Sequence, residues 1–325
     1  MPETMRVLRL TRLEGPDALE IGEAPVPDAP GAVIIDVHAA GVAFADLLMT
    51  RGQYQFRPDL PFVPGSDIAG VVRSAPDDSG FRSGDRVVAT GFGAWAEVAA
   101  AAPASTFVIP DGMSFEQATS LINYQTGYFG LVTRGALQPG EHVLVHGAAG
   151  GVGTAAVQIA RGLGAEVIAV AQGDEKRAIA AEAGAQHTLD ADGDWLEAAK
   201  ALTGGRGVEM VYDPVGGDRF TDSLRALAPG GRLLVIGFAG GAIPQVKVNR
   251  LLLNNTSVIG VAWPEWARVH PETRAVVAAG LQALWDSGHV RPIVGQVFPL
   301  ERGADALRAI EERRATGKIV LRVRE

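Results

Sequence analysis

The pattern of apolar and polar positions divides the chain into two kinds of region. From residue 141 to residue 263, short apolar runs that read as buried strands alternate with longer stretches of helical pattern. Strands that alternate with helices pair in parallel, so this central region predicts a doubly wound parallel sheet. The expected strands are residues 142–146, 166–171, 187–189, 208–213, 232–237 and 256–262, and the expected helices begin at 154 and span 174–183, 195–202 and 220–227.

The first third of the chain has short strands broken by Gly and Pro at close spacing, which favours a largely antiparallel β domain. After the centre, helices and strands alternate again, as if the tail returned to complete the first domain. We therefore predict an α/β protein in which residues 1–120 and 264–325 form one domain. Residues 121–263 form an inserted dinucleotide-binding domain, with a cleft between the two. The outer strands are expected at 5–10, 32–40, 68–73, 85–90, 94–99, 106–109, 294–299 and 318–323, and the outer helices at 272–287 and 303–316.

A glycine-rich turn joins the first central strand to its helix. It holds Gly147, Gly150, Gly151 and Gly153. Glycines let backbone N–H groups approach a pyrophosphate, and the free N–H groups and positive end of the new helix face the phosphate charge. A glycine-rich loop alone also occurs as a plain turn, but here the strands and helices that the motif requires follow it. We predict that Gly150, Gly151, Val152 and Gly153 bind a dinucleotide.

The end of the second central strand bears on which dinucleotide binds. NAD sites usually place Asp or Glu there to accept the ribose hydroxyls, and that charge repels a 2′-phosphate. This strand ends Ala171, Gln172, Gly173 without an acid, which favours NADPH and makes Gln172 a candidate contact. The alternative is that Asp174 is the ribose acid. We interpret Asp174 as a helix N-cap instead, because good helix formers follow it.

Composition and charge narrow the classes of function. With 325 residues, 47% hydrophobic and 20% charged, the chain suits two folded domains. The formal net charge of −8 argues against nucleic acid or an anionic membrane as partner, which leaves a small-molecule substrate. Without a signal-peptide pattern or an apolar run long enough to span a membrane, we expect a cytoplasmic protein. The chain has no Cys and its six His residues lack ligand spacing, so we predict no metal site.

Several motifs spread over the chain resemble those of one family. They are GQYQFRPDLPFVPG (52–65), SGDRV (83–87), NYQTGY (123–128), AAGGVG (148–153), VYDPVGG (211–217) and ATGKIVL (315–321). With them the chain resembles the zinc-free medium-chain dehydrogenase/reductases, in the NADPH:quinone oxidoreductase group that includes ζ-crystallin. The resemblance implies a GroES-like catalytic domain, an inserted Rossmann domain, and a homodimer joined edge to edge by Rossmann sheets. Zinc-bearing relatives place metal ligands where this chain has Ala43, Ser66 and Asp67, so no catalytic zinc is implied.

The same resemblance assigns roles to individual residues. Lys176 stands at the phosphate-binding lysine of quinone reductases, although a solvated helix face is the alternative interpretation. Thr126 and Tyr128 are expected along the nicotinamide half of the cofactor, with Thr126 also catalytic, while a helix-core role is the alternative for Tyr128. The other positions implied to lie near cofactor or substrate are Phe44, Gly237, Phe238, Ala239 and Lys318. A surface charge is the alternative for Lys318, and the subunit edge is the alternative for Phe238 and Ala239.

The chain departs from the family pattern at two positions. Quinone reductases often have Tyr near the adenosine phosphate where this chain has Ala191, which weakens the argument for NADPH. Close relatives commonly have Asn where this chain has Ala43. The loss of that amide removes a hydrogen-bond donor beside the cofactor or substrate. It leaves open a protein that binds NADPH with little turnover, as a crystallin does.

Without a metal or a Ser-Tyr-Lys constellation, hydride transfer must rest on holding the nicotinamide against an electron-poor acceptor. A quinone suits such a site, because its carbonyls are electrophilic and its product anion is easily protonated. The main alternative is an enoyl thioester or another α,β-unsaturated carbonyl, whose α-carbon needs a proton donor. Tyr54 is the candidate donor, because its loop resembles the GxY loop of enoyl-thioester reductases. Packing of the ring on the β domain is the other interpretation.

Overall fold

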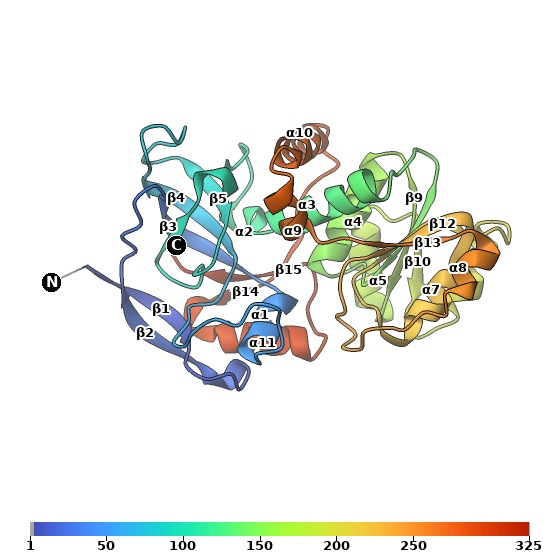
Figure 1. Ribbon diagram of the computed structural model, residues 1–325, viewed down its shortest axis with the longest axis horizontal. Coiled ribbons are helices and arrows are strands. Elements are labelled where there is room, and N and C mark those ends of the chain that lie inside the picture. The colour runs from blue at the N-terminus through green and yellow to red at the C-terminus, as the bar shows by residue number, and fades with distance from the viewer. Residues whose placement is uncertain (1–2, 325) are drawn as a thin grey trace. The chain divides into compact units, whose positions relative to one another are not determined.

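The computed structural model of the protein describes residues 3–324, which form two compact units (Figure 1). The first unit combines the residues up to Ile122 with those from Val294 onward, and the second is Asn123–Ile293. The second unit is therefore inserted into the first. The predicted fold class is confirmed, since a mainly antiparallel, GroES-like sheet accompanies a parallel, Rossmann-type sheet.

A seven-stranded sheet in the order β14-β15-β3-β4-β5-β7, with β6 paired to β3, forms the first unit (Figure 1). Its one parallel pair is β14 with β15, and β15 pairs antiparallel with β3. A separate ribbon pairs β1 with β2. The strands are β1 (Thr4–Leu10), β2 (Leu19–Pro25), β3 (Val33–Val42), β4 (Asp67–Ser74), β5 (Arg86–Thr90), β6 (Val98–Ala101), β7 (Thr106–Val108), β14 (Val294–Pro299) and β15 (Lys318–Arg322), and the helices are α1 (Phe44–Thr50), α2 (Phe115–Ala118) and α11 (Gly303–Glu311).

The second unit contains a six-stranded parallel sheet in the order β10-β9-β8-β11-β12-β13 (Figure 1). On one face, Trp195, Phe220 and Leu224 pack against Leu144 and Ile168 of the sheet. The strands are β8 (His142–His146), β9 (Glu166–Ala171), β10 (His187–Asp190), β11 (Val208–Asp213), β12 (Leu227–Val235) and β13 (Ser257–Gly260), and the helices are α3 (Leu121–Tyr128), α4 (Gly151–Gly162), α5 (Gly173–Glu182), α6 (Trp195–Leu202), α7 (Phe220–Ala226), α8 (Asn249–Asn254), α9 (Trp263–Val269) and α10 (Thr273–Asp286).

The predicted elements of the centre lie close to the observed ones, with differences at their ends. The helix after the glycine turn begins at Gly151, three residues before the predicted start, because Gly150 already has the extended conformation of an N-cap. Strand β2 was not predicted. Its alternation of Leu19 and Ile21 with charged residues is short, and the strand is fixed by pairing with β1.

The second unit extends beyond the predicted domain boundary at residue 263. Helix α10 packs on the inserted domain, where a Cβ on Gly162 would lie 2.7 Å from the Leu284 side chain and where Gly280 lies directly against the Tyr128 ring. Gln158 Nε2 also donates a hydrogen bond to the carbonyl of Arg291 at 2.8 Å. These contacts place residues 264–293 with the second unit.

Candidate functional site

The glycine turn has the geometry of an anion-binding helix start. Strand β8 ends at His146, Gly147 follows with φ of +57°, and Gly150 is the N-cap of α4. Because the first N–H groups of a helix lack partners within it, the backbone of residues 151–153 presents donors at this end of α4. Gly150 through Gly153 thus form the predicted turn, and the binding of a dinucleotide there stays a prediction.

Two glycines of this turn are required for different physical reasons. A Cβ on Gly153 would lie 2.7 Å from the Cα of Ala148 and would collide with the carbonyl oxygen of Gly147, so only glycine lets α4 pack onto the turn. A Cβ on Gly150 would meet nothing closer than that same oxygen, at 3.5 Å. Gly150 therefore leaves open space on the outer side of the turn.

The loop after β9 contributes polar and charged groups at the same end of the sheet. Gln172 is the N-cap of α5, and its Nε2 donates a hydrogen bond to Asp192 Oδ2 at 2.8 Å. The prediction that Asp174 is the N-cap was wrong. Asp174 lies in the first turn of α5, where it is highly exposed and forms an ion pair with Arg177. Lys176 follows in the same turn.

The loops after β11 and β12 hold each other by backbone hydrogen bonds. Ala239 N donates to the carbonyl of Pro214 at 3.0 Å, and Gly240 N donates to that of Val215 at 2.8 Å. Asp213 fixes the first loop, since its Oδ1 accepts hydrogen bonds from the backbone N–H groups of Val215 and Gly216. The predicted contacts Gly237, Phe238 and Ala239 follow β12.

The carboxyl end of the parallel sheet thus gathers most of the predicted cofactor contacts. In open α/β sheets, ligands bind outside the carboxyl ends of the strands. The glycine turn follows β8, Gln172 and Lys176 follow β9, and Gly237 to Ala239 follow β12. The fold therefore brings together three segments that are distant in the sequence, along one edge that suits a dinucleotide.

Helix α3 carries the predicted residues Thr126 and Tyr128. Thr126 is half-buried, and the Tyr128 ring lies against Gly280 of α10. Two neighbours that sequence reasoning missed are buried and hydrogen-bonded. Tyr124 donates to Gln158 Oε1 at 2.7 Å, and Gln125 Oε1 accepts from Trp263 Nε1 at 3.1 Å. These bonds fix the helix in the second unit.

A buried charge cluster lies where β3 and β15 meet in the first unit. Lys318 Nζ is 2.5 Å from Asp67 Oδ2, and the side chains are 3% and 1% exposed. Gly41 makes room for this pair, because a Cβ there would lie 2.6 Å from the Asp67 oxygen and 2.7 Å from the Lys318 nitrogen. Lys318, expected by resemblance near the cofactor, thus has a partner inside its own unit, and its cofactor contact stays a prediction.

Asp46 lies near this ion pair and carries an altered acidity. Its Oδ2 accepts a hydrogen bond from Ala43 N at 2.8 Å, which caps the start of α1 beside Phe44. Burial raises the pKa of Asp46 to about 7, and the charge of Asp67 acts in the same direction, while Lys318 and the Ala43 N–H oppose it. A protonated Asp46 leaves the cluster electrically neutral, which limits the cost of burying it.

Tyr54 lies half-buried in the loop between α1 and β4. Three aromatic rings that sequence reasoning missed lie together in the first unit. Phe56 stacks on Phe92 with ring centroids 4.7 Å apart, and Phe62 meets both edge-on at 6.1 and 5.8 Å. Phe56 and Phe92 are 42% and 48% exposed. The repeated aromatic residues of the Tyr54 loop were the available signal.

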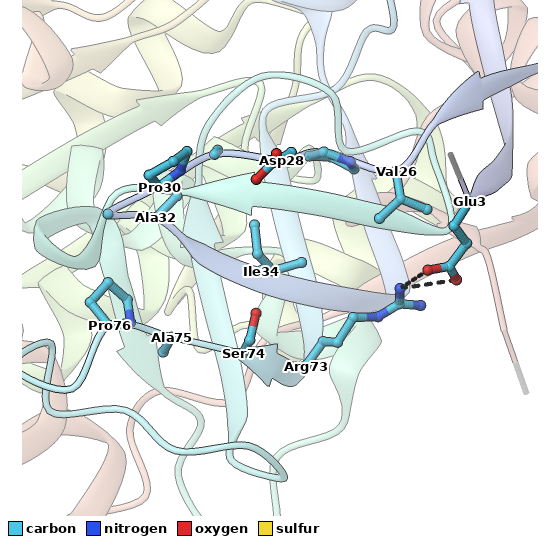
Figure 2. A pocket seen from close by; sticks show the side chains of 13 residues that line it. Glu3, Val26, Asp28, Pro30, Ala32, Ile34, Arg73, Ser74, Ala75 and Pro76 are labelled. Atoms are coloured by element: carbon cyan, nitrogen blue, oxygen red, sulfur yellow. Dashed lines mark hydrogen bonds and ion pairs between the residues drawn. The ribbon is translucent and has the colours of Figure 1, made fainter. Parts of the chain in front are cut away.

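A surface depression in the first unit is lined by other residues. It has a volume of about 460 Å³ and is lined by the Pro-rich segment from Val26 to Ala32 and by Arg73, which pairs with Glu3 (Figure 2). None of the predicted site residues lines it. Over residues 3–324, no group of three or more His, Asp or Glu side chains is placed to hold a metal ion, and no helix has the length and apolar character to cross a bilayer.

The two units define an architecture of a GroES-like domain with an inserted Rossmann domain, and the comparisons agree. Family models match for the alcohol dehydrogenase GroES-like domain over residues 29–111 and for a zinc-binding dehydrogenase over residues 151–279. Quinone oxidoreductase-like protein 2 of Bos taurus is 40% identical over 303 residues, which cover 91% of this chain and 86% of the relative.

Solved structures extend the similarity over nearly the whole chain. A probable oxidoreductase from Mycobacterium abscessus has a TM-score of 0.92 and 45% identity, with 99% of this chain and 100% of that chain covered. A mycobacterial protein in complex with NADPH has a TM-score of 0.89 and 32% identity, with 98% and 100% covered. CurK enoyl reductase has a TM-score of 0.88 and 26% identity, with 98% and 99% covered.

The chain belongs to the zinc-free medium-chain dehydrogenase/reductase family, which confirms the resemblance of its motifs. It is an oxidoreductase of that family. The second family model carries zinc in its description. Where the resemblance places the ligands of zinc-bearing relatives, this chain has Ala43, Ser66 and Asp67, and Asp67 forms an ion pair with Lys318.

Proposed function

We propose that the protein transfers a hydride from NADPH to a quinone without the help of zinc. The observation that carries the proposal is the carboxyl end of β9, where Gln172 and not an acid directly follows Ala171 and where Lys176 comes in the first turn of α5. A ribose 2′-phosphate is compatible with such an end, and a carboxylate would repel it. The similarity to a mycobacterial protein solved with NADPH supports the same cofactor.

The residues of the second unit are proposed to bind and orient the cofactor. The N–H groups of Gly150 to Gly153 bind the pyrophosphate, and Gln172 and Lys176 contact the adenosine end. Thr126, Tyr128 and the segment Gly237 to Ala239 hold the nicotinamide half. Phe44 and Lys318 are the other proposed cofactor contacts. When bound, NADPH supplies a hydride at the C4 position of its nicotinamide ring.

The first unit is proposed to provide the acceptor site. Asp67, at one of the positions where the resemblance places a zinc ligand, is paired with the Lys318 ammonium, and the two charges neutralise each other. We therefore assign no group at these positions that would polarise the acceptor. This favours an acceptor that is already electron-poor. A quinone has this property, and the relatives named quinone oxidoreductase support it.

An enoyl thioester or enone is the second candidate acceptor. It is favoured by Tyr54, which stands in a loop like that of enoyl-thioester reductases and has a hydroxyl able to protonate the α-carbon, and by the similarity to CurK enoyl reductase. The two reactions differ in their need for this proton. The role of Tyr54 therefore distinguishes them.

We expect the purified protein to oxidise NADPH, followed by its absorbance, with 1,4-benzoquinone or 9,10-phenanthrenequinone. Tyr54→Phe, which removes only the hydroxyl, is expected to change quinone kcat/KM by less than about 3-fold. Reduction of enones or enoyl-CoA by the same variant is expected to fall by about 10²-fold or more, the usual contribution of a general acid.

Tyr54→Ala is the control for packing, because it also removes the ring. Equal and small losses on both acceptor classes in Tyr54→Phe, with larger losses in Tyr54→Ala, would assign Tyr54 to packing of its loop. Tight NADPH binding with no turnover of any quinone, enone or enoyl-CoA would contradict the proposed reaction and favour a crystallin-like binding protein. A higher specificity constant with NADH than with NADPH would reverse the choice of cofactor.

We also propose a homodimer joined through the β13 edge of the six-stranded sheet. An edge strand presents unpaired backbone groups, and large exposed apolar patches mark contact surfaces. Leu252 and Leu253 of α8 are 75% and 79% exposed, and Val258 of β13 is 37% exposed. Leu252→Glu with Leu253→Glu is expected to halve the mass measured by light scattering, while Val108→Glu, at an exposed position of β7, leaves it unchanged. A monomeric native protein would rule out the dimer.

A further inference from the structure

We propose that Arg219 is a further residue that selects the 2′-phosphorylated cofactor, and that Asp192 holds its guanidinium until a phosphate takes the place of the carboxylate. This inference rests on the proposed function, since it concerns how the NADPH site discriminates against NADH. It adds two residues that no motif in the sequence indicated.

Asp192 connects three loops at the carboxyl end of the parallel sheet. It lies just after β10, and its two carboxylate oxygens face different partners. Oδ2 accepts the hydrogen bond from Gln172, which follows β9, and Oδ1 is 3.6 Å from Arg219 Nη2. Arg219 follows β11 and ends a short 3-10 turn, Gly217–Arg219. Asp192 thus brings the guanidinium to the side of the loop where the adenosine phosphate is proposed to bind.

The backbone of Arg219 is fixed relative to the glycine turn by buried hydrogen bonds. Ser223 Oγ donates to the carbonyl of Arg219 at 3.0 Å and lies 2.9 Å from His146 Nε2. His146 is the last residue of β8, directly before Gly147. Burial lowers the pKa of His146 to about 4, so the ring is neutral and Nε2 can serve as the donor to Ser223. The start of the Arg219 side chain is therefore held in place.

The charges around Arg219 allow a cofactor phosphate to replace the Asp192 carboxylate as the partner of its guanidinium. At 3.6 Å, its ion pair with Asp192 is longer than a direct hydrogen bond, and the two side chains are 30% and 60% exposed. A phosphate dianion offers more charge and a geometry that arginine binds in a bidentate manner. The nearby Arg177 is already paired with Asp174. Arg219 is thus held by a longer contact than Arg177 is.

The negative charge of Asp192 also opposes a 2′-phosphate at this place. Asp190 lies two residues earlier, and its Oδ1 accepts a hydrogen bond from Asp192 N at 3.1 Å. That bond lowers the pKa of Asp190, with further lowering by the charges of Arg177 and Arg219. Two carboxylates and two arginines therefore lie close together, and removing one carboxylate shifts the local balance toward a phosphate.

The test measures dissociation constants by fluorescence titration for NADPH and NADH, and by calorimetry for 2′,5′-ADP, which lacks the nicotinamide. Arg219→Gln is expected to weaken NADPH and 2′,5′-ADP by about 10-fold or more, the usual value of a charge-assisted hydrogen bond, and NADH by less than about 2-fold. Asp192→Asn, which preserves shape, is expected to tighten NADPH and 2′,5′-ADP several-fold. The matched control is Arg225→Gln, an exposed α7 arginine paired with Asp222, and it should change nothing.

Three results would overturn this role. Equal weakening of NADPH and NADH by Arg219→Gln would make Arg219 structural, and an unchanged NADPH-to-NADH ratio in both variants would exclude it from selection. Weaker NADH binding in Asp192→Asn would identify Asp192 as a ribose acid instead. Failure of the proposed function is distinct, because a native protein that prefers NADH or binds neither nucleotide is seen before any variant is made. If Arg219→Gln does not fold, Asp192→Asn carries the test alone.

Discussion

Replacing Lys318 with Met is expected to lower the free energy of unfolding by about 3–5 kcal/mol, the usual effect of breaking a buried ion pair. The substitution leaves the Asp67 carboxylate, 1% exposed, without its cation. Asp67 then has to remain charged in an apolar place or take up a proton, and both cost free energy. Equilibrium unfolding in urea, with the midpoint and slope compared between variants, measures this loss.

The double variant Lys318→Met with Asp67→Leu separates the charge from the packing. Since replacing both members of a buried pair by apolar residues is often neutral, the double variant should recover most of the lost stability. Lys200→Met is the control at an exposed pair with Glu197, where a change of less than about 0.5 kcal/mol is expected. If the single and double variants lose the same stability, the ion pair is not the cause.

The second large effect is expected at the glycine turn. Gly150→Val should weaken NADPH binding by about 100-fold or more while changing the free energy of unfolding by less than about 1 kcal/mol. Gly150 has φ of −84° and ψ of 171°, which a β-branched residue adopts without strain. Its Cβ would lie 3.5 Å from the nearest atom, so the side chain extends into the space where the pyrophosphate is proposed to lie. Fluorescence titration with NADPH and urea unfolding measure the two quantities.

Gly153→Ala is the matched contrast within the same turn. Its Cβ would lie 2.7 Å from the Cα of Ala148, so the turn has to move and stability should fall together with affinity. A Gly150→Val variant that keeps both native stability and native affinity would show that no phosphate lies at this turn. Comparison of the two variants therefore separates a binding role from a folding role.

The sequence was informative where structure is decided locally. Short apolar runs between glycines indicated the strands of the parallel sheet, and the glycine turn is where the strand, turn and helix order predicts it. Strand β2 was not predicted because its charged, partly exposed residues show little alternation of apolar and polar positions. Its structure is decided by pairing with β1. The extent of the second unit was missed because α10 joins it through contacts such as Gly280 with Tyr128, which no local pattern reveals.

The candidate site was predictable in its positions and much less so in its contacts. The resemblance pointed to Lys318, but its partner Asp67 is 251 residues earlier and is reached through the pairing of β15 with β3. Gln172 was expected from the end of its strand, while its bond to Asp192 and the approach of Arg219 depend on the order of strands in the sheet. Such contacts arise between segments whose spacing in the sequence carries no information about distance.

The insertion of one unit into the other also governs the order in which the protein can fold. A ribosome completes residues 123–293 before it makes β15, yet β15 lies between β14 and β3 in the sheet of the first unit. Because domains generally fold as units, the second unit can fold on the nascent chain before β15 is synthesised. At that stage the edge of β3 that pairs with β15 is still unpaired, and Asp67 still lacks its ion-pair partner Lys318. The first unit thus closes last, and its closure requires the strand that begins at Lys318.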